Sequence, residues 1–226
     1  MQVPQKLRLI GPTAFRTFRC VWMLQELGVP YEHSTAPPWS DEVKQYHPMG
    51  KVPVLVVDDT FSLYESAAIN TFLGDVYHDT EGRALVPLVP SIERAKYDQT
   101  ILCIMTEIDA QGLWIHRKHA ALGKVFGEIP DAVAAAKNQF AKANQTVSLQ
   151  LDPYLLGESF SAADILYVHC LDWAIAIGWQ DTWDKDNIMA PRLVEYLKLC
   201  RSRPAYEQSV VIRNQEREQK KVQANI

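Results

Sequence analysis

The apolar and polar positions of the chain follow one pattern in its first third and another in the rest. Over residues 1–82, short apolar runs alternate with amphipathic segments, as strands alternate with helices. From residue 91 onward, apolar side chains recur at helical spacing only. The sequence therefore predicts an α/β domain over residues 1–82, followed by an all-helical domain over residues 91–226.

The first domain is expected to contain its elements in the order β-α-β-α-β-β-α. Gly28 is a stop signal for the first helix, and Ser40 and Ser66 are expected to cap the second and third. Strands are predicted at 7–10, 31–35, 54–57 and 61–64, and helices at 15–27, 40–46 and 66–77.

The second domain is expected to be helical throughout. Residues 78–95, HDTEGRALVPLVPSIERA, have the polar and proline-rich character of a linker. The tail Arg213–Ile226 is mostly charged or amide-bearing, so it is expected to be frayed or disordered. Helices are predicted at 91–119, 130–151, 161–177, 190–200 and 205–212. The spacing of Ser161 and Asp164 is that of a capping box, so both are expected to have a structural role.

Composition narrows the possible classes of protein. The 226 residues are 47% hydrophobic and 22% charged with a net charge of −4, which is ordinary for a globular protein and offers no basic surface for nucleic acid. No apolar run suggests a signal peptide or a membrane span. Four widely separated cysteines, without metal-ligand spacing, are expected to be reduced core thiols of a cytoplasmic protein: Cys20, Cys103, Cys170 and Cys200.

Pro53 opens the apolar run Val54–Val57, which is the position that a residue without an N–H can occupy in a strand. If the Val52–Pro53 peptide bond is cis, Val52 turns its own N–H and C=O outward. Such an exposed pair can dock another peptide backbone.

The pair Glu65-Ser66 stands where a strand gives way to a helix. A serine at a helix start offers a hydroxyl and free backbone N–H groups to a carboxylate, and a glutamate offers charge to an ammonium. Together with Val52, this pair predicts a site for a small peptide that carries a free amino-acid end.

Five segments, in this order, resemble those of the cytosolic glutathione S-transferases, with a bacterial-type, theta-like sequence. The likeness covers essentially the whole chain, and five segments in one order are far more specific than any one of them. They are FRCVWMLQELGVPYE, HPMGKVPVL with YESAAI, TEIDAQGLWIHRKH, LLGESFSAADI and RSRPAYEQ.

This resemblance implies a thioredoxin-like first domain with Pro53 cis, followed by the all-helical domain, and a homodimer that binds neither nucleic acid nor membrane. It implies glutathione as cosubstrate and no metal. Val52 would pair with the cysteinyl backbone, Glu65 and Ser66 would hold the γ-glutamyl end, and Lys51 would bind the glycine carboxylate.

The group that activates the glutathione thiol is less evident. Related sequences place a hydroxyl at positions that here hold Pro12 and Phe15. Thr13 is the candidate catalytic donor of a hydrogen bond to the thiolate, which would lower the thiol pKa. Thr17, one turn into the helix, and activation by backbone N–H groups alone are the alternatives.

The resemblance also implies a cleft for a hydrophobic electrophile, lined by Phe15, Met105, Asp109 and Trp114. The helical stripe that carries the last three is equally typical of core packing. His116 and His119 have the i, i+3 spacing of metal ligands, but no carboxylate or thiol completes a site, so both are expected to be solvated helix residues.

The resemblance implies a transferase that conjugates glutathione to small hydrophobic electrophiles. A non-catalytic glutathione-fold binding protein is the alternative, and Phe15 favours it. A glutathione-dependent reductase or peroxidase is disfavoured because Cys20 lies inside the first helix and not at its start.

Overall fold

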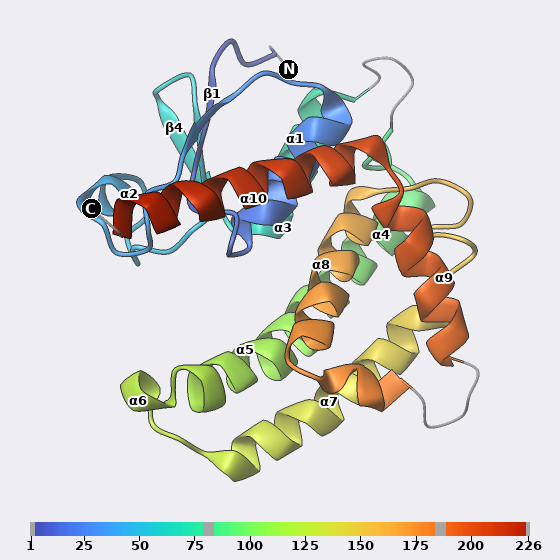
Figure 1. Ribbon diagram of the computed structural model, residues 1–226. Helices are drawn as coiled ribbons and strands as arrows, with labels where there is room; N and C mark the ends of the chain where they lie inside the picture. The colour runs from blue at the N-terminus through green and yellow to red at the C-terminus, as the bar shows by residue number, and fades with distance from the viewer. Residues whose placement is uncertain (1–2, 79–83, 184–188, 225–226) are drawn as a thin grey trace. The chain divides into compact units, whose positions relative to one another are not determined.

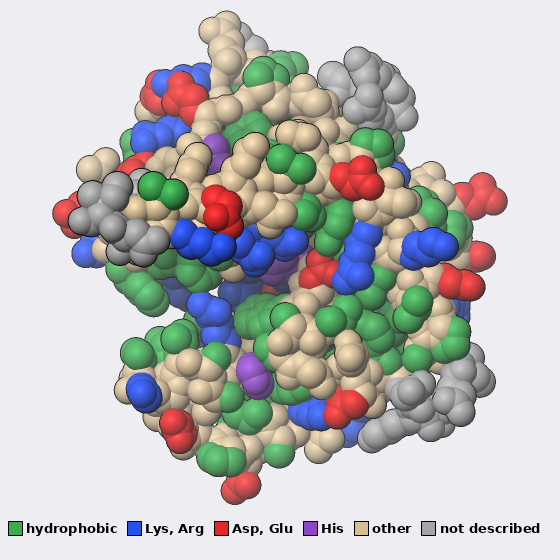
Figure 2. All heavy atoms as spheres, viewed as in Figure 1, with side chains coloured by type: hydrophobic (Ala, Val, Ile, Leu, Met, Phe, Trp, Pro, Cys, Tyr) green, Lys and Arg blue, Asp and Glu red, His purple; other side chains and the backbone are tan. Residues whose placement is uncertain are grey.

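The computed structural model describes residues 3–78, 84–183 and 189–224 (Figure 1). Its contacts divide the chain into two compact units. The first comprises Met1–Val86 together with Arg201–Ile226, and the second comprises Pro87–Cys200. On the face shown in Figure 2, acidic and basic side chains are interspersed, in keeping with the small net charge.

The first unit contains a four-stranded sheet in the order β2-β1-β3-β4. β1 pairs in parallel with β2 and antiparallel with β3, which pairs antiparallel with β4. The four predicted strands are confirmed as β1 Leu7–Ile10, β2 Glu32–Ser34, β3 Val54–Val57 and β4 Phe61–Tyr64.

Both faces of the central strands are covered. All four residues of β3 are buried, as expected for a continuous apolar run in a sheet with two covered faces. Ile10, Val54 and Val56 form a buried cluster with Val43 of α2 (Asp41–Tyr46). Because strand side chains alternate, Leu55 points to the opposite face.

The helix α1 (Thr17–Leu27) is buried on nearly all sides. It contacts α3 (Ser66–Val76) and α10 (Pro204–Ala224), which runs alongside it in Figure 1. Gly28 ends it in the left-handed conformation, with φ of 63°, as the stop signal predicted.

The structure corrects the prediction for the C-terminal tail. Residues Arg213–Ile226 were expected to be frayed, but the helix α10 continues through Ala224 and belongs to the first unit by its contacts. Contacts with α1 hold this polar helix: Tyr206 packs edge-on against Trp22 at 4.8 Å, and Arg213 of the tail lies over the Phe18 ring at 4.5 Å. The predicted second domain, residues 91–226, therefore differs from the second unit, which ends at Cys200.

The second unit is built from helices. Over its described residues, the predicted helix 91–119 is one helical run that contains π-helical segments, and the predicted helices 130–151, 161–177 and 190–200 match within a few residues. The elements are α4 Ile92–Cys103, η2 Ile104–Leu113, α5 Trp114–His116, η3 Arg117–Ala121, α6 Gly123–Phe126, α7 Pro130–Ser148, α8 Ala162–Ala176, η4 Trp179–Trp183 and α9 Met189–Arg201.

The helix α8 lies in the core of this unit and begins with the predicted capping box of Ser161 and Asp164. The buried Asp164 carboxylate accepts hydrogen bonds from Ser161 N at 2.8 Å, Leu155 N at 3.0 Å and the Tyr196 hydroxyl at 2.9 Å. Burial raises the pKa of Asp164, and these hydrogen bonds oppose that shift. Ser161 and Asp164 therefore have the structural role that the sequence predicted.

The cysteines are all free thiols, as predicted. Cys20, Cys170 and Cys200 are buried, whereas Cys103 is only partly buried. Among the described helices, none is both long enough and apolar enough to cross a membrane.

Candidate functional site

The loop before β3 presents the backbone of Val52 at the end of the sheet. The Val52–Pro53 peptide bond is cis, as the resemblance implied. The sheet pairing of β3 begins only at Val54, so Val52 lies beyond the ladder. Lys51 is exposed, Val52 is half-buried and Pro53 is buried. Lys51 and Val52 are thus placed where a ligand backbone could reach them.

The start of α3 carries no side-chain cap. Ser66 was expected to be the N-cap, but the structure places Glu65 in that position and Ser66 as the first helical residue. Glu65 is exposed, has φ of 72° and makes no capping hydrogen bond. Since the first amides of a helix have no partner within it, those of α3 remain available to an anion such as a carboxylate.

A buried guanidinium lies beneath this helix start. Arg19 of α1 is fully buried, and its Nη1 donates a 3.2 Å hydrogen bond to Ser66 Oγ. Asn70 Nδ2, one turn further along α3, donates to the Arg19 carbonyl at 3.3 Å. Arg19 therefore adds positive charge directly behind the candidate carboxylate site.

Sequence reasoning did not identify Arg19 as part of the site. The available signal was a charged residue between Phe18 and Cys20 on a helix that is otherwise apolar on both faces. Charged side chains are almost never fully buried unless they are paired. The pairing with Ser66, however, joins residues 47 positions apart and could not be read locally.

Sequence reasoning also did not assign His47 to the site. It is 2% exposed, its ring lies 4.3 Å from that of Tyr64, and its Nδ1 accepts a hydrogen bond from Met49 N at 3.1 Å. Burial lowers the pKa of His47, Lys51 lowers it further, and the Glu65 charge opposes both. The charges of Lys51 and Glu65 both act on the pKa of His47, so His47 lies close to these two residues of the candidate site.

Thr13, the candidate catalytic residue, is 2% exposed and bound to α10. Its backbone N–H and its hydroxyl both donate to Glu216 Oε2, at 2.9 and 2.7 Å. Glu216 Oε1 lies 3.5 Å from His33 Nδ1, and His33 Nε2 lies 2.9 Å from the Gly11 carbonyl oxygen. A hydroxyl has one proton, so Thr13 cannot donate to a thiolate while this bond persists.

Thr17 is fully buried near the loop that holds Val52. A Cβ built on Gly11 would lie 2.5 Å from Thr17 Oγ1 and 2.7 Å from Val52 Cβ, so only glycine, here with φ of 131°, fits at this point. Thr17 Oγ1 is buried without a hydrogen-bond partner among the described residues. The same close approach leaves Thr17 no exposed surface for contact with a ligand.

Residues 16–76, which carry most of these features, match a family model described as Glutathione S-transferase, N-terminal domain. This match covers about a quarter of the chain and indicates the glutathione S-transferase family. The thioredoxin-like sheet of the first unit and the helices of the second agree with this likeness.

Two curated members of the family show how far the match extends. Glutathione S-transferase F14 of Arabidopsis thaliana is 29% identical over 178 residues, 74% of this chain and 66% of that protein. Glutathione S-transferase 3 of Schizosaccharomyces pombe is 34% identical over 114 residues, 47% of this chain and 38% of that protein. The chain thus spans less than two thirds of the length of either transferase.

Solved transferase structures share the fold. A glutathione transferase homolog from Sulfitobacter, determined with bound glutathione, superimposes with a TM-score of 0.72. The match covers 90% of this chain and 96% of that one at 18% sequence identity. At 18% identity, this likeness shows a common fold and nothing about the chemistry of this chain.

The residues predicted to line the electrophile cleft are divided between the units. Phe15 is half-buried in the turn before α1, where its N–H donates to the Pro12 carbonyl at 3.2 Å. Met105 and Asp109 lie on η2 and Trp114 at the start of α5, with Asp109 buried and the other two half-buried. That these four residues form one cleft stays a prediction.

His116 and His119 are both held by neighbours in the second unit. The His116 ring packs edge-on against Trp179 at 5.2 Å, and burial lowers its pKa. His119 Nδ1 lies 2.9 Å from the Gly127 carbonyl oxygen. The sequence predicted that both side chains are solvated. Neither is fully solvated in the structure, because each contacts a partner outside its own helical run. In the part of the chain that is described, no group of three potential metal ligands occurs.

Proposed function

We propose that this chain binds glutathione in its first unit and conjugates the glutathione thiolate to small hydrophobic electrophiles. The observation that carries the proposal is the uncapped start of α3 at Glu65 and Ser66, backed by the buried Arg19. An α-carboxylate would accept hydrogen bonds from the amides of α3, and Glu65 would pair with the α-ammonium.

The rest of the glutathione molecule would follow the predicted assignments. The N–H and C=O of Val52 would pair with the cysteinyl residue, next to the buried ring of Pro53. The exposed ammonium of Lys51 would bind the glycine carboxylate. The electrophile would lie near Phe15, Met105, Asp109 and Trp114, in a cytoplasmic homodimer with a detoxification role.

Thiol activation by Thr13 would require a change in its hydrogen bonding. We propose that the Thr13 hydroxyl turns from Glu216 toward the glutathione sulfur when α10 moves and carries Glu216 away. Without that change, only backbone N–H groups and the dipole of α1 would stabilise the thiolate. This dependence on Glu216 favours the second candidate function, a glutathione-binding protein without transferase activity.

A glutathione-dependent redox activity has less support. Cys20 is fully buried within α1, and burial raises the pKa of its thiol strongly, so that it is protonated at neutral pH. A reactive cysteine requires the opposite environment, with partial exposure and a depressed pKa.

The binding proposal is tested by calorimetry with glutathione. Glu65→Ala should weaken binding by about 1.5–3 kcal/mol, the usual contribution of a hydrogen bond to a charged group. Glu93→Ala is the matched control, since Glu93 is an exposed glutamate in the first turn of α4. Equal affinities for the wild type and Glu65→Ala would refute the assignment. Turnover of an activated aryl chloride with glutathione then separates the transferase from the binding protein.

A further inference from the structure

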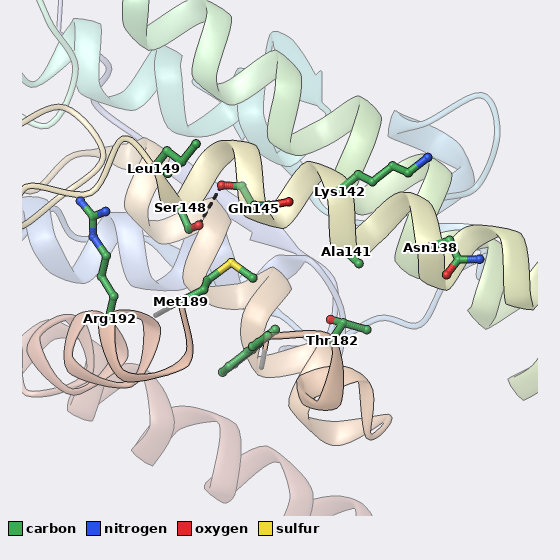
Figure 3. Close-up of a pocket in the computed structure, with 10 residues that line it drawn as sticks. Asn138, Ala141, Lys142, Gln145, Ser148, Leu149, Thr182, Met189 and Arg192 are labelled. Atoms are coloured by element: carbon green, nitrogen blue, oxygen red, sulfur yellow. Dashed lines mark hydrogen bonds between the residues drawn. The ribbon is translucent and has the colours of Figure 1, made fainter. Parts of the chain in front are cut away.

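A turn in the first unit, between α2 and β3, leads into the candidate glutathione site. The cavity drawn in Figure 3 lies in the second unit, and no residue of its described lining belongs to that site. His47 caps the C-terminal end of α2 and begins the turn, and Gly50 is followed directly by Lys51 and Val52. The geometry of residues 47–50 therefore decides where these two candidate binding residues lie.

His47 holds this turn with both its backbone and its side chain. Its N–H donates to the Val43 carbonyl at 2.9 Å, and its carbonyl accepts from Gly50 N at 2.8 Å. Its Nδ1 accepts from Met49 N at 3.1 Å. Of these three hydrogen bonds, the last is the one that a change in the imidazole ring can break.

The His47 ring also contacts the other half of the candidate site. His47 is 2% exposed, and its ring centroid lies 4.3 Å from that of the Tyr64 ring. Tyr64 is the last residue of β4 and directly precedes Glu65. His47 therefore links the loop that carries Lys51 and Val52 to the segment that carries Glu65.

The hydrogen bond from Met49 requires a neutral imidazole. Nδ1 accepts only when the ring proton is on Nε2, and in the imidazolium ion both nitrogens donate. Protonation would direct Nδ1–H against Met49 N–H, whose nitrogen lies 3.1 Å from Nδ1. The turn would then open at this point, and Lys51 and Val52 would move with it.

Titratable side chains from three segments face the His47 ring in the described part of the chain: Tyr64 of β4, Glu65 at the start of α3, and Lys51 of the loop. Burial lowers the pKa of His47, Glu65 opposes this shift, and Lys51 adds to it. The ring is therefore mainly neutral at pH 7 and takes up a proton on acidification. The imidazolium would also attract the Glu65 carboxylate, which the proposed function assigns to the α-ammonium of glutathione.

We propose that His47 positions the candidate glutathione site and makes its affinity depend on pH. The neutral ring holds the turn that presents Lys51 and Val52, and the protonated ring releases the turn and draws Glu65 away from the ligand. This role of His47 rests on the proposed function, since it concerns the affinity of that same site. The added positive charge would by itself attract an anionic ligand, so the direction of the pH effect separates loss of positioning from charge attraction.

Calorimetry with S-methylglutathione at pH 7.5 and at pH 5.0 tests this role. The ligand has no thiol, and neither its carboxyl groups nor its amino group has an ordinary pKa between 5 and 7.5. Wild-type affinity should fall about three-fold or more at the lower pH, because the free protein binds a proton that the complex excludes. An affinity that is unchanged or higher at pH 5.0 would overturn the proposal.

His47→Asn is the informative variant, because asparagine carries an acceptor oxygen in the place of Nδ1 but takes up no proton in this range. It should bind within about two-fold of the wild type at pH 7.5 and keep that affinity at pH 5.0. His47→Leu offers Met49 no acceptor and should bind about five-fold more weakly at pH 7.5. A wild-type pH dependence in His47→Asn would overturn the proposal.

His116→Asn is the matched control. His116 is a histidine of the second unit whose pKa is also lowered by burial. This variant should keep the wild-type dependence of S-methylglutathione affinity on pH.

Amide NMR of the unliganded protein separates this role from the binding proposal. The amides of Met49, Lys51 and Val52 should titrate together between pH 7.5 and 5.0 in the wild type and keep constant shifts in His47→Asn. A chain that binds no S-methylglutathione at either pH would refute the proposed function, and such shifts would still support the control of the turn by His47. Amides that titrate equally in both proteins would overturn the role of His47 in either case.

Discussion

Thr13 has a single hydroxyl proton, and Glu216 accepts it at 2.7 Å. A carboxylate in this buried position also raises the free energy of a nearby thiolate, because the two negative charges repel each other. Thiol activation by Thr13 would therefore depend on the release of this hydrogen bond by Glu216.

Glu216→Ala should lower the pKa of bound glutathione and accelerate conjugation about ten-fold, since it frees the Thr13 hydroxyl and removes the charge. Thiolate absorbance as a function of pH measures the first effect, and turnover of an aryl chloride measures the second. Thr13→Ala in the same background should cancel the part of both gains that comes from the hydroxyl and leave the part that comes from the removed charge. If the thiol pKa is the same in all three proteins, Thr13 takes no part in activation.

His47 makes the stability of the first unit sensitive to acid. Burial holds its pKa below the ordinary value, so the unfolded chain binds a proton more readily than the folded one as the pH falls through about 6.5. Stability should therefore be full above that pH and decrease below it. Protonation at Nδ1 would also break the hydrogen bond from Met49 N.

Urea unfolding between pH 5 and 8 measures this dependence. His47→Gln should flatten the pH profile of the unfolding free energy in the acid range. His116 has a pKa lowered in the same direction, so His116→Gln provides the parallel measurement for the second unit. A wild-type profile retained unchanged in His47→Gln would show that His47 has no such effect.

At the scale of elements, α1 is enclosed by α3 on one side and α10 on another. Tyr206 of α10 packs against Trp22 at 4.8 Å and against Phe18 at 5.9 Å, and Arg213 lies over the Phe18 ring at 4.5 Å. These contacts bury apolar surface of α1 that the sheet does not cover. The helix α10 is therefore part of the core of the first unit and not an appendage.

Tyr206→Ala should destabilise the first unit by about 3–5 kcal/mol, as expected for loss of a buried aromatic side chain. Val211→Ala is the control on the same helix, since Val211 is 45% exposed and should change stability by less than about 0.5 kcal/mol. Unfolding followed by tryptophan fluorescence reports both. Equal stabilities of the two variants would mean that α10 is held by its polar contacts alone.

At the scale of the whole molecule, the resemblance implies a homodimer, and exposed apolar side chains on α4 offer a surface for it. Ile92 is 71% exposed and Leu102 61% exposed. Light scattering at micromolar concentration should give about twice the 25.7 kDa mass of one chain. Leu102→Glu should shift that mass toward a single chain, because an unpaired charge is costly in an apolar interface.

Val194→Glu is the control for this experiment, since Val194 is 58% exposed on α9. Its mass should match that of the wild type. A wild-type protein that scatters as one chain at these concentrations would exclude the dimer.

The sequence alone was sufficient for features that depend on a few neighbouring residues. The strands Val54–Val57 and Phe61–Tyr64 begin and end where the apolar pattern predicted. Ser40 caps α2 by accepting from Val43 N at 3.3 Å, and the Ser161–Asp164 box spans three positions. Such signals are local because turn, cap and strand geometry is decided by the backbone within one turn or strand.

Only the tertiary structure could show what surrounds the candidate site. Arg19 reaches Ser66 across 47 positions, Arg203 reaches Glu26 across 177, and Glu216 reaches Thr13 across 203. The polar tail was expected to be disordered because its own sequence buries little apolar surface. It is ordered because α1 supplies that surface, and a contact between residues so distant leaves no periodic signal in the chain.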